Sequence, residues 1–263
     1  MNRIEPLRIS IIGAGKVAKA LCRALSLGGV EIVEIYNRTR INAEKLAAEL
    51  DNTKVVDRIE DLNTNVDAVA VLVKDDALES TAKLIPHNIR RFHASGVTDR
   101  KVLGEENGVV WPIKSFNDQS SYDSLSGVPF GVDASSDEFR ETLDKIVKCV
   151  GGRGFHAPSE VRDKVHLAAV FADNFANHCL AISQQILQDS GFSTDLLHTL
   201  AEGLLSGAAT GTSFERQTGV AIRGDKGSQQ KHMELIKSFS NSQELAEFYS
   251  LLSKHISESH NTH

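Results

Sequence analysis

The sequence predicts an α/β fold, a doubly wound parallel sheet, followed by an all-α helical domain. Apolar, strand-like runs alternate with helix-like segments as far as His156, which is typical of a parallel sheet with helices on both faces. From Ser159 onward no strand pattern occurs, and apolar residues recur every three or four positions. The change falls at Pro158, so we expect residues 1–157 to form the sheet domain and residues 158–263 the helical domain.

The first strand, helix and second strand follow one another closely. The apolar run Ile9–Ile12 leads into the helical pattern Lys16–Leu27, and the strand pattern Val30–Tyr36 follows. Residues 13–18, between the first strand and the helix, have the pattern Gly-x-Gly-x-x-Ala. In this position the pattern is typical of the mononucleotide-binding half of a Rossmann domain.

This glycine-rich turn predicts a dinucleotide site. Gly13 permits a tight turn, and Gly15 has no Cβ that would keep phosphates away from the backbone. The N–H groups and the dipole of the first helical turn favour an anion such as a pyrophosphate. The predicted contacts are Gly13, Ala14, Gly15, Lys16 and Val17. The alternative is a tight turn that holds no ligand.

The residues after the second strand indicate which dinucleotide binds. Folds that prefer NAD carry an Asp or Glu there, which accepts hydrogen bonds from the ribose. This chain has Asn37-Arg38-Thr39-Arg40 instead. Arg38 offers a planar set of donors for a 2′-phosphate, and Thr39 adds a hydroxyl. We therefore predict NADP(H) rather than NAD(H), with Asn37, Arg38 and Thr39 as contacts. The alternative is that Arg38 and Arg40 are solvated side chains at the start of a helix.

The rest of the sheet domain supplies further candidate contacts. Strands are expected over residues 53–56, 66–73, 89–96, 109–113, 128–132 and 151–156, and helices over 42–50, 77–84 and 137–149. Asp75 or Asp76 is expected to cap the helix 77–84. In open α/β sheets, ligands bind beyond the carboxyl ends of the strands. The contacts predicted on this ground are Val73, Lys74, Ser95 and Gly96.

The helical domain is predicted to open with one long helix. It runs over Val161–Asp189 with Ser159 as N-cap, and further helices are expected over 195–205, 229–239 and 244–255. At roughly 100° per residue, His166, Asp173 and Asn177 lie within about 20° of a common line, and Asn174 and His178 lie on the adjoining face.

His166 and Asn174 are the candidate catalytic residues. Reduction of C=O or C=N by hydride requires a proton donor, and an imidazole can supply a proton at neutral pH. His166 is predicted to be that donor, with Asn174 orienting the substrate. The alternative is that these polar side chains hydrogen-bond neighbouring helices or solvent. Arg223 could hold a substrate carboxylate or could pair with Asp225 or Glu215.

Composition excludes several classes of partner. The net charge is −6 and the pI is near 5.9, which argues against nucleic acid and anionic membranes. No apolar run has the length of a membrane helix, and residues 1–7 have no signal pattern, so we expect a cytoplasmic protein. The three cysteines lack metal-ligand spacing and are expected to be reduced core residues; these are Cys22, Cys149 and Cys179.

Several segments together resemble a known family. They are residues 11–18, His93-Ala94-Ser95-Gly96, residues 111–116, residues 166–178 and residues 217–225. On these the chain resembles the Rossmann-like proteins that carry a C-terminal domain of unknown function, DUF2520, which are related to pyrroline-5-carboxylate reductases, ketopantoate reductases and 3-hydroxyacid dehydrogenases. The resemblance implies an NADP-dependent oxidoreductase and a homodimer formed through the helical domain.

The chain also departs from these relatives. Trp111, Lys114 and Val220 differ from residues that family members often have. The helix Lys and Asn pair of 3-hydroxyacid dehydrogenases is missing, because Lys164 is followed four residues later by Ala168. We expect reduction of a small-molecule carbonyl or imine substrate, in a cleft between the sheet and the long helix. The alternatives are a non-catalytic NADP-binding sensor or scaffold, and an oxidoreductase that uses a deazaflavin (F420).

Overall fold

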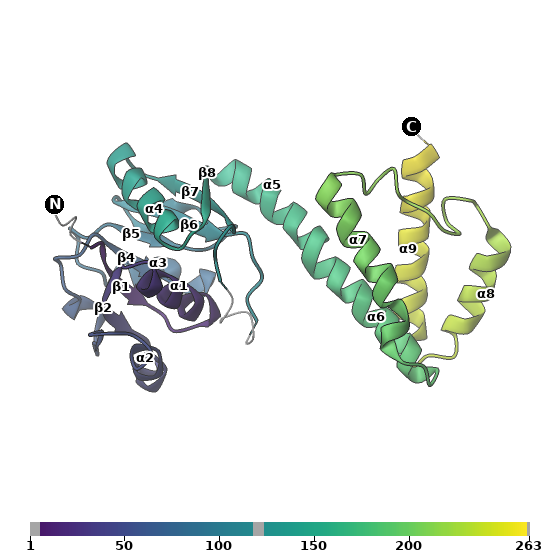
Figure 1. Cartoon of the computed structure of the whole chain (residues 1–263), viewed down its shortest axis with the longest axis horizontal. Coiled ribbons are helices and arrows are strands. Elements are labelled where there is room, and N and C mark those ends of the chain that lie inside the picture. The colour runs from purple at the N-terminus through teal and green to yellow at the C-terminus, as the bar shows by residue number, and fades with distance from the viewer. Residues whose placement is uncertain (1–5, 118–123, 262–263) are drawn as a thin grey trace. The chain divides into compact units, whose positions relative to one another are not determined.

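The computed structural model describes residues 6–117 and 124–261, with two compact units, residues 1–178 and 179–263 (Figure 1). The first unit contains the sheet, its covering helices and the first part of the long helix. The second contains the remaining helices. The sheet ends with His156, close to the predicted boundary at Pro158, whereas contacts divide the chain between His178 and Cys179. The long helix contacts the sheet unit over its first half, which explains the later division.

The first unit is built on an eight-stranded sheet with the order β3-β2-β1-β4-β5-β6-β7-β8. Its strands are β1 (Arg8–Ile12), β2 (Glu31–Tyr36), β3 (Lys54–Val55), β4 (Ala68–Val71), β5 (Arg91–His93), β6 (Asn107–Pro112), β7 (Pro129–Ala134) and β8 (Arg153–His156). All neighbouring strands are parallel except β6 and β7. The chain leaves β1 toward β2 on one side and returns as β4 on the other, so the topological switch lies between β1 and β4. The predicted doubly wound α/β fold is confirmed.

Helices and short 3₁₀ turns connect the strands, and one helix of this unit, α5, follows the last strand. The helices are α1 (Lys16–Leu27), α2 (Arg40–Ala47), α3 (Leu78–Ala82), α4 (Asp137–Cys149) and α5 (Ser159–Ala169), and the 3₁₀ turns are Ile59–Asp61, Asp75–Ala77 and Arg100–Leu103. Helix α4 begins after Ser136, whose hydroxyl accepts a hydrogen bond from the Phe139 N–H at 3.3 Å. Helix α1 ends at Gly28, where a Cβ would lie 2.1 Å from the Cys149 carbonyl oxygen. Glycine at this position therefore allows α1 to pack closely against α4.

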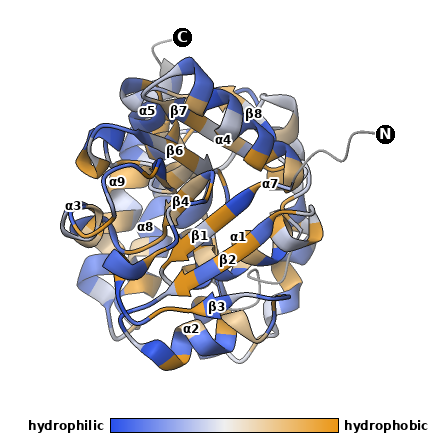
Figure 2. Ribbon diagram, turned by 90° about the vertical axis from the view of Figure 1, so that its left-hand side faces the viewer, coloured by the Kyte–Doolittle hydropathy of each residue, from blue (hydrophilic) through white to orange (hydrophobic). Residues whose placement is uncertain are grey.

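Two hydrophobic clusters cover the two faces of the sheet. One packs α1 and α4 against the strands through residues such as Leu21, Leu25, Phe139 and Leu143. The other packs α3 and the adjoining turns through Leu78 and other residues. Figure 2 shows hydrophobic residues along strands β1 and β2. Burial on both faces explains the nearly continuous apolar runs in the sequence.

The long helix is continuous but changes its winding. Helix α5 passes into a π-helical segment, Val170–Phe175, and then into α6 (Ala176–Asp189). Ser159 is the first residue of α5, and Pro158 occupies the cap position, so the predicted Ser159 cap is wrong. The π segment adds a residue to the turn and shifts the faces of the residues that follow it. The predicted alignment of His166 with Asn177 assumed α-helical winding throughout and does not hold across this segment.

The second unit is helical and has little core of its own. It contains the rest of α6, the 3₁₀ turn Thr194–Leu197, α7 (His198–Thr210), α8 (Lys226–Ile236) and α9 (Ser242–Asn261). Among its described residues, the buried ones are Gly207, Ala221, Ile236 and Leu245. Large apolar side chains instead lie exposed on its helices, among them Leu200, Leu204, Leu205, Leu251 and Leu252.

Further features concern the whole of the described chain. None of its described helices is both long and apolar enough to cross a membrane. The same residues hold no group of three or more His, Cys, Asp or Glu side chains arranged for a metal ion.

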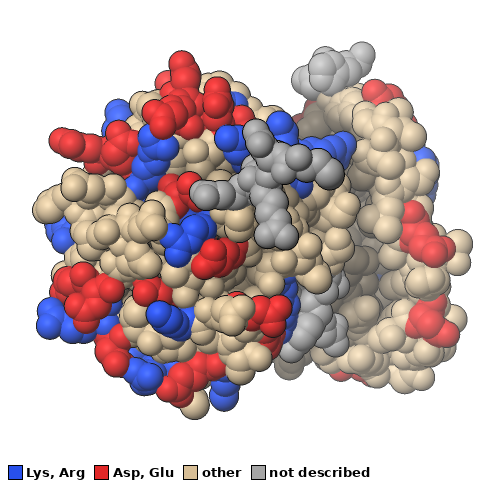
Figure 3. Space-filling model, turned by 60° about the vertical axis from the view of Figure 1, so that its left-hand side comes forward, with Lys and Arg blue, Asp and Glu red and all other residues tan. Residues whose placement is uncertain are grey.

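The three cysteines are free thiols with different exposure. Cys22 is buried, and burial raises the pKa of its thiol to about 12. Cys179 is exposed, so the prediction that all three are core residues is wrong. On the face shown in Figure 3, positive and negative residues are interspersed.

Candidate functional site

The glycine-rich turn lies at the topological switch point. Gly13 has φ +113°, and a Cβ there would lie 2.2 Å from the Leu72 carbonyl oxygen after β4. The Gly13 N–H donates to the Tyr36 carbonyl oxygen at 2.8 Å. Gly13 is therefore held between the ends of β2 and β4, in a backbone conformation that disfavours side chains.

Gly15 has a different environment. It is exposed, occupies the N-cap position of α1, and a Cβ there would meet nothing within 4 Å. The space over Gly15 is open at the N-terminus of a twelve-residue helix, where N–H groups and the dipole favour an anion. Of the other predicted contacts in the turn, Ala14 is buried, Lys16 is exposed and Val17 is half-buried.

The segment after β2 contains two arginines in different situations. Arg40 forms ion pairs with Glu44, at 2.7 Å, and with Asp57. Arg38 is exposed and forms no ion pair with any residue that the structure describes. The Asn37 amide donates to the Thr39 carbonyl oxygen at 2.9 Å, and Thr39 precedes α2. The tertiary structure therefore distinguishes Arg40, whose guanidinium is paired, from Arg38, which has no ion pair with a described residue; the sequence alone does not distinguish them.

The ends of β4 and β5 are joined through Ser95. Its hydroxyl donates to Asp75 Oδ2 at 2.9 Å and accepts from the N–H groups of Val97 and Thr98. Neither Asp75 nor Asp76 caps α3 with its side chain, so that prediction is wrong; Asp75 bonds Ser95 instead. Ser95 thus stabilises the turn after β5. Val73 is half-buried and Lys74 is exposed just beyond β4.

Gly96, Trp111 and His166 form a small aromatic cluster. The two rings are tilted at 43° with centroids 5.9 Å apart. A Cβ on Gly96 would lie 2.7 Å from His166 Cδ2 and 2.9 Å from Trp111 Nε1. Gly96 is therefore required for both rings to occupy their positions. The structure brings predicted residues His166 and Gly96 together, at the carboxyl end of β5.

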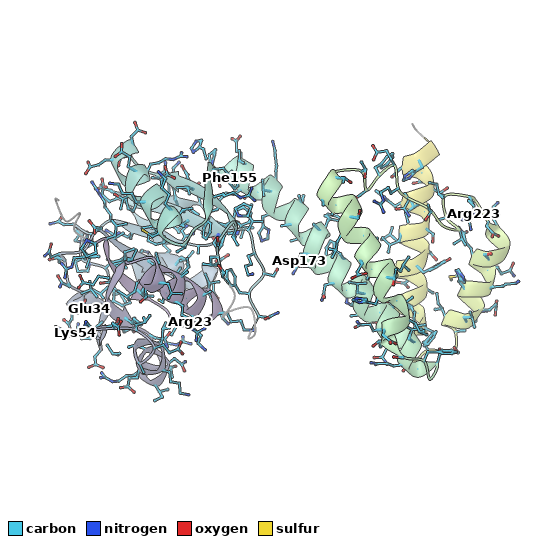
Figure 4. The ribbon with its side chains drawn as sticks, in the orientation of Figure 1. Arg23, Glu34, Lys54, Phe155, Asp173 and Arg223 are labelled. Carbon is cyan, nitrogen blue, oxygen red and sulfur yellow. The ribbon has the colours of Figure 1, made fainter. Side chains whose placement is uncertain are left out.

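The π-helical segment of the long helix contacts the residues that follow β6. The Ser115 hydroxyl donates to Asp173, which Figure 4 labels on the long helix. Asn174, the other predicted catalytic residue, is exposed, and its side chain hydrogen-bonds no described residue. Arg223, also labelled in Figure 4, is exposed between α7 and α8. Hydrogen bonds from the N–H and hydroxyl of Ser228 lower the pKa of Asp225, and the positive charge of Arg223 adds to this effect.

Sequence reasoning missed a buried polar network beneath these residues. Arg162 on α5 is 1% exposed and donates to the carbonyl oxygens of Ala157, at 2.9 Å, and Thr98, at 2.8 Å. Its Nη1 lies 3.8 Å from Asp133 Oδ2, and Arg100 pairs with the same carboxylate at 2.9 Å. This network attaches the start of α5 to the sheet and so positions His166 one turn further along. The sequence signal that could have indicated this network is Arg162 itself, a charged residue in the first turn of the helix that follows the last strand.

His93 lies in the same interior. It is fully buried, and its Nδ1 accepts a hydrogen bond from the Ser95 N–H at 3.1 Å, so Nε2 carries the proton of the neutral ring. Burial, assisted by the positive charge of Arg162, lowers the pKa of His93 to about 4. His93 is therefore neutral at physiological pH and supports the turn that holds Ser95 and Gly96.

A cavity of about 370 Å³ lies within the second unit. Its lining includes Lys226, Met233, Tyr249 and Lys254, from α8 and α9. None of the residues predicted from the sequence as cofactor or catalytic contacts lines it.

The parallel sheet, the switch-point glycine turn and the helix that follows the last strand define a Rossmann-type protein with an appended helical region. Residues 128–256 match the family DUF2520, a domain of unknown function, and residues 1–88 match the shikimate / quinate 5-dehydrogenase family. The chain is a Rossmann-like protein with a C-terminal DUF2520 domain. A comparison with curated proteins found no significant match.

Solved structures share this fold over nearly the whole chain. A putative NADP oxidoreductase from Bacteroides fragilis is 28% identical with a TM-score of 0.84, over 96% of this chain and 98% of that one. A Thermotoga maritima protein is 23% identical with a TM-score of 0.69, over 96% and 99%. An imine reductase from Myxococcus stipitatus in complex with NADP⁺ is 14% identical with a TM-score of 0.66, over 97% and 94%. The last two show a common fold.

Proposed function

We propose that this protein is an NADP(H)-dependent oxidoreductase that reduces a C=O or C=N bond of a small molecule. The observation that carries the proposal is the open N-terminus of α1 at the switch between β1 and β4, where Gly15 leaves space and Gly13 holds the turn. The similarity to the putative NADP oxidoreductase from Bacteroides fragilis and to the imine reductase in complex with NADP⁺ supports it.

The residues present fit a phosphorylated dinucleotide. The backbone of residues 13–17 would hold the pyrophosphate. Arg38 would pair with a 2′-phosphate, since its guanidinium forms no ion pair or hydrogen bond with a described residue. Val73, Lys74 and Gly96 lie at the carboxyl ends of β4 and β5, where the rest of such a ligand would extend. When bound, a reduced nicotinamide supplies a hydride to an electrophilic carbon.

His166 completes the reduction in this proposal. When the carbon accepts the hydride, the π bond to oxygen or nitrogen breaks, and that atom requires one proton. The His166 imidazolium donates it and recovers a proton from solvent, giving the alcohol or amine. The substrate would lie beside Gly96 and Trp111, and Asn174 would orient it.

The cofactor assignment is tested by a matched pair of arginine variants. Arg38→Ala removes the guanidinium available to a 2′-phosphate and should weaken NADPH binding by roughly ten- to a hundredfold, with little effect on NADH. Arg40→Ala removes a residue already paired with Glu44 and Asp57 and should change neither affinity tenfold. Isothermal titration with both nucleotides measures the effects. Equal losses for NADPH and NADH in Arg38→Ala would count against a 2′-phosphate contact.

The catalytic assignment is tested with His166→Gln, which keeps a polar side chain but removes the titratable proton. Loss of NADPH oxidation across a panel of keto acids and cyclic imines is expected, with NADPH affinity retained. Unchanged turnover would remove His166 from the mechanism. Tight NADPH binding by the wild-type protein without turnover on any compound would favour the sensor.

We also propose a homodimer formed through the second unit. Its described residues bury few apolar side chains, while Leu200, Leu204 and Leu205 on α7 are 63–71% exposed. A helical unit of this size without a core is unstable alone, and a second copy offers the same apolar surface in return.

A further inference from the structure

The indole ring of Trp111 is largely buried, but its N–H group has no hydrogen-bond partner among the described residues. The side chain is 7% exposed, yet Nε1 donates no hydrogen bond to any described residue. Nε1 is not one of the enclosed side-chain atoms that lack a partner in the described chain, so the N–H reaches the surface of the described structure. It can therefore donate to an acceptor from outside the described residues.

The sheet holds this ring in one position. Trp111 on β6 lies directly opposite Gly131 on β7, where a Cβ would be 3.1 Å from the indole Cε3. On its other side, Gly96 leaves room for the indole edge that carries Nε1. Two glycines thus flank Trp111, so the direction of its N–H is determined by packing.

The His166 ring lies at the same point. Its Cδ2, the ring carbon bonded to Nε2, lies close to the position that a Gly96 Cβ would occupy, as does Trp111 Nε1. The His166 side chain hydrogen-bonds no described residue and is half-buried. The Trp111 N–H group and the His166 ring, whose side chains have no hydrogen-bond partner among the described residues, therefore lie together beside Gly96, after the carboxyl end of β5.

We infer that Trp111 Nε1 and His166 form a two-donor subsite for a substrate with two adjacent oxygen acceptors, a 2-oxo carboxylate. This inference rests on the proposed function. His166 would donate to the oxygen of the reacting carbonyl, and the indole N–H would donate to the neighbouring carboxylate. Trp111 is then a specificity-determining residue that selects oxo acids over simple ketones.

Oxalate is the probe, because it carries two adjacent carboxylates and is not reduced; acetate, with one, is the control ligand. Both are titrated calorimetrically into the NADPH-saturated protein. Trp111→Phe keeps an aromatic side chain but removes the indole N–H, and should weaken oxalate binding about tenfold while NADPH affinity is retained. Phe155→Leu alters a half-buried neighbour of Gly131, labelled in Figure 4, and should leave oxalate affinity unchanged.

A second measurement needs no variant. Trp111 is the single tryptophan of the chain, so its fluorescence reports on this subsite alone. Oxalate should change that emission, and acetate should not.

The outcomes separate the two proposals. If oxalate binds no better than acetate, or binds Trp111→Phe as tightly as the wild type, the subsite is wrong and the proposed function stands. If Trp111→Phe weakens NADPH as much as oxalate, the indole contacts the cofactor and the subsite is overturned. If NADPH does not bind the wild-type protein, the proposed function fails, together with the subsite that rests on it.

Discussion

At the scale of single residues, burial decides the protonation state of His93. Its neutral ring accepts from the Ser95 N–H, and burial together with Arg162 lowers its pKa to about 4. In the unfolded chain a histidine has a pKa near 6.5. Between these two values the unfolded state binds more protons than the folded state, so stability falls as the pH falls.

We therefore expect His93 to contribute an acid-sensitive term to stability. The free energy of unfolding should lose about 3 kcal/mol through this residue between roughly pH 6.5 and pH 4. Urea denaturation across this range measures the loss, and His93→Gln should make the profile shallower. His87→Gln removes an exposed histidine and serves as the control. Parallel profiles for the wild type and His93→Gln would contradict the expectation.

Residue types alone predicted which side chains could do chemistry, but not which had partners. Ser95 was predicted at the cofactor, yet its hydroxyl is used within the turn. Arg38 and Arg40 are equivalent in the sequence, and only the position of Glu44 and Asp57 distinguishes them. The Gly96–Trp111–His166 cluster joins residues from three separate segments, so no local pattern could reveal it.

At the scale of elements, the bounds of α1 and α4 were predicted correctly, because each helix has a regular apolar stripe and a clear boundary residue. Gly28 follows the end of α1, and Ser136 precedes the start of α4. The edge strand β3 and helix α3 are shorter than predicted. The π-helical segment Val170–Phe175 was not predicted, since its residues carry an ordinary helical pattern. Tertiary contacts such as Ser115 with Asp173 accompany it.

The two glycines of the β1–α1 turn should respond differently to alanine. Gly13→Ala places a Cβ against the Leu72 carbonyl at positive φ, and should destabilise the protein by about 3 kcal/mol or more. Gly15→Ala meets no atom of the protein, so stability should be kept, but the methyl group would occupy the phosphate position and weaken NADPH binding at least about tenfold. Thermal unfolding and calorimetric titration measure the two effects. Normal NADPH affinity in Gly15→Ala would argue against a pyrophosphate at this turn.

At the scale of the whole molecule, the described residues of the helical unit bury less apolar surface than a stable unit requires. We expect the protein to be a dimer in solution, and Leu200→Glu with Leu204→Glu on α7 to convert it to a less stable monomer. Light scattering coupled to gel filtration measures the mass. Leu27→Glu changes a leucine that is 91% exposed on the sheet unit, and should leave the dimer intact. A monomeric wild-type protein at micromolar concentration would contradict the proposal.

The sequence by itself determined the α/β class, the glycine turn and the change to helices after Pro158, because these depend on local periodicity and on backbone requirements of single residues. The tertiary structure alone decided which polar groups are paired, how the long helix winds, and which rings meet at Gly96. Those features depend on contacts between residues far apart in the chain, and only packing brings such residues together.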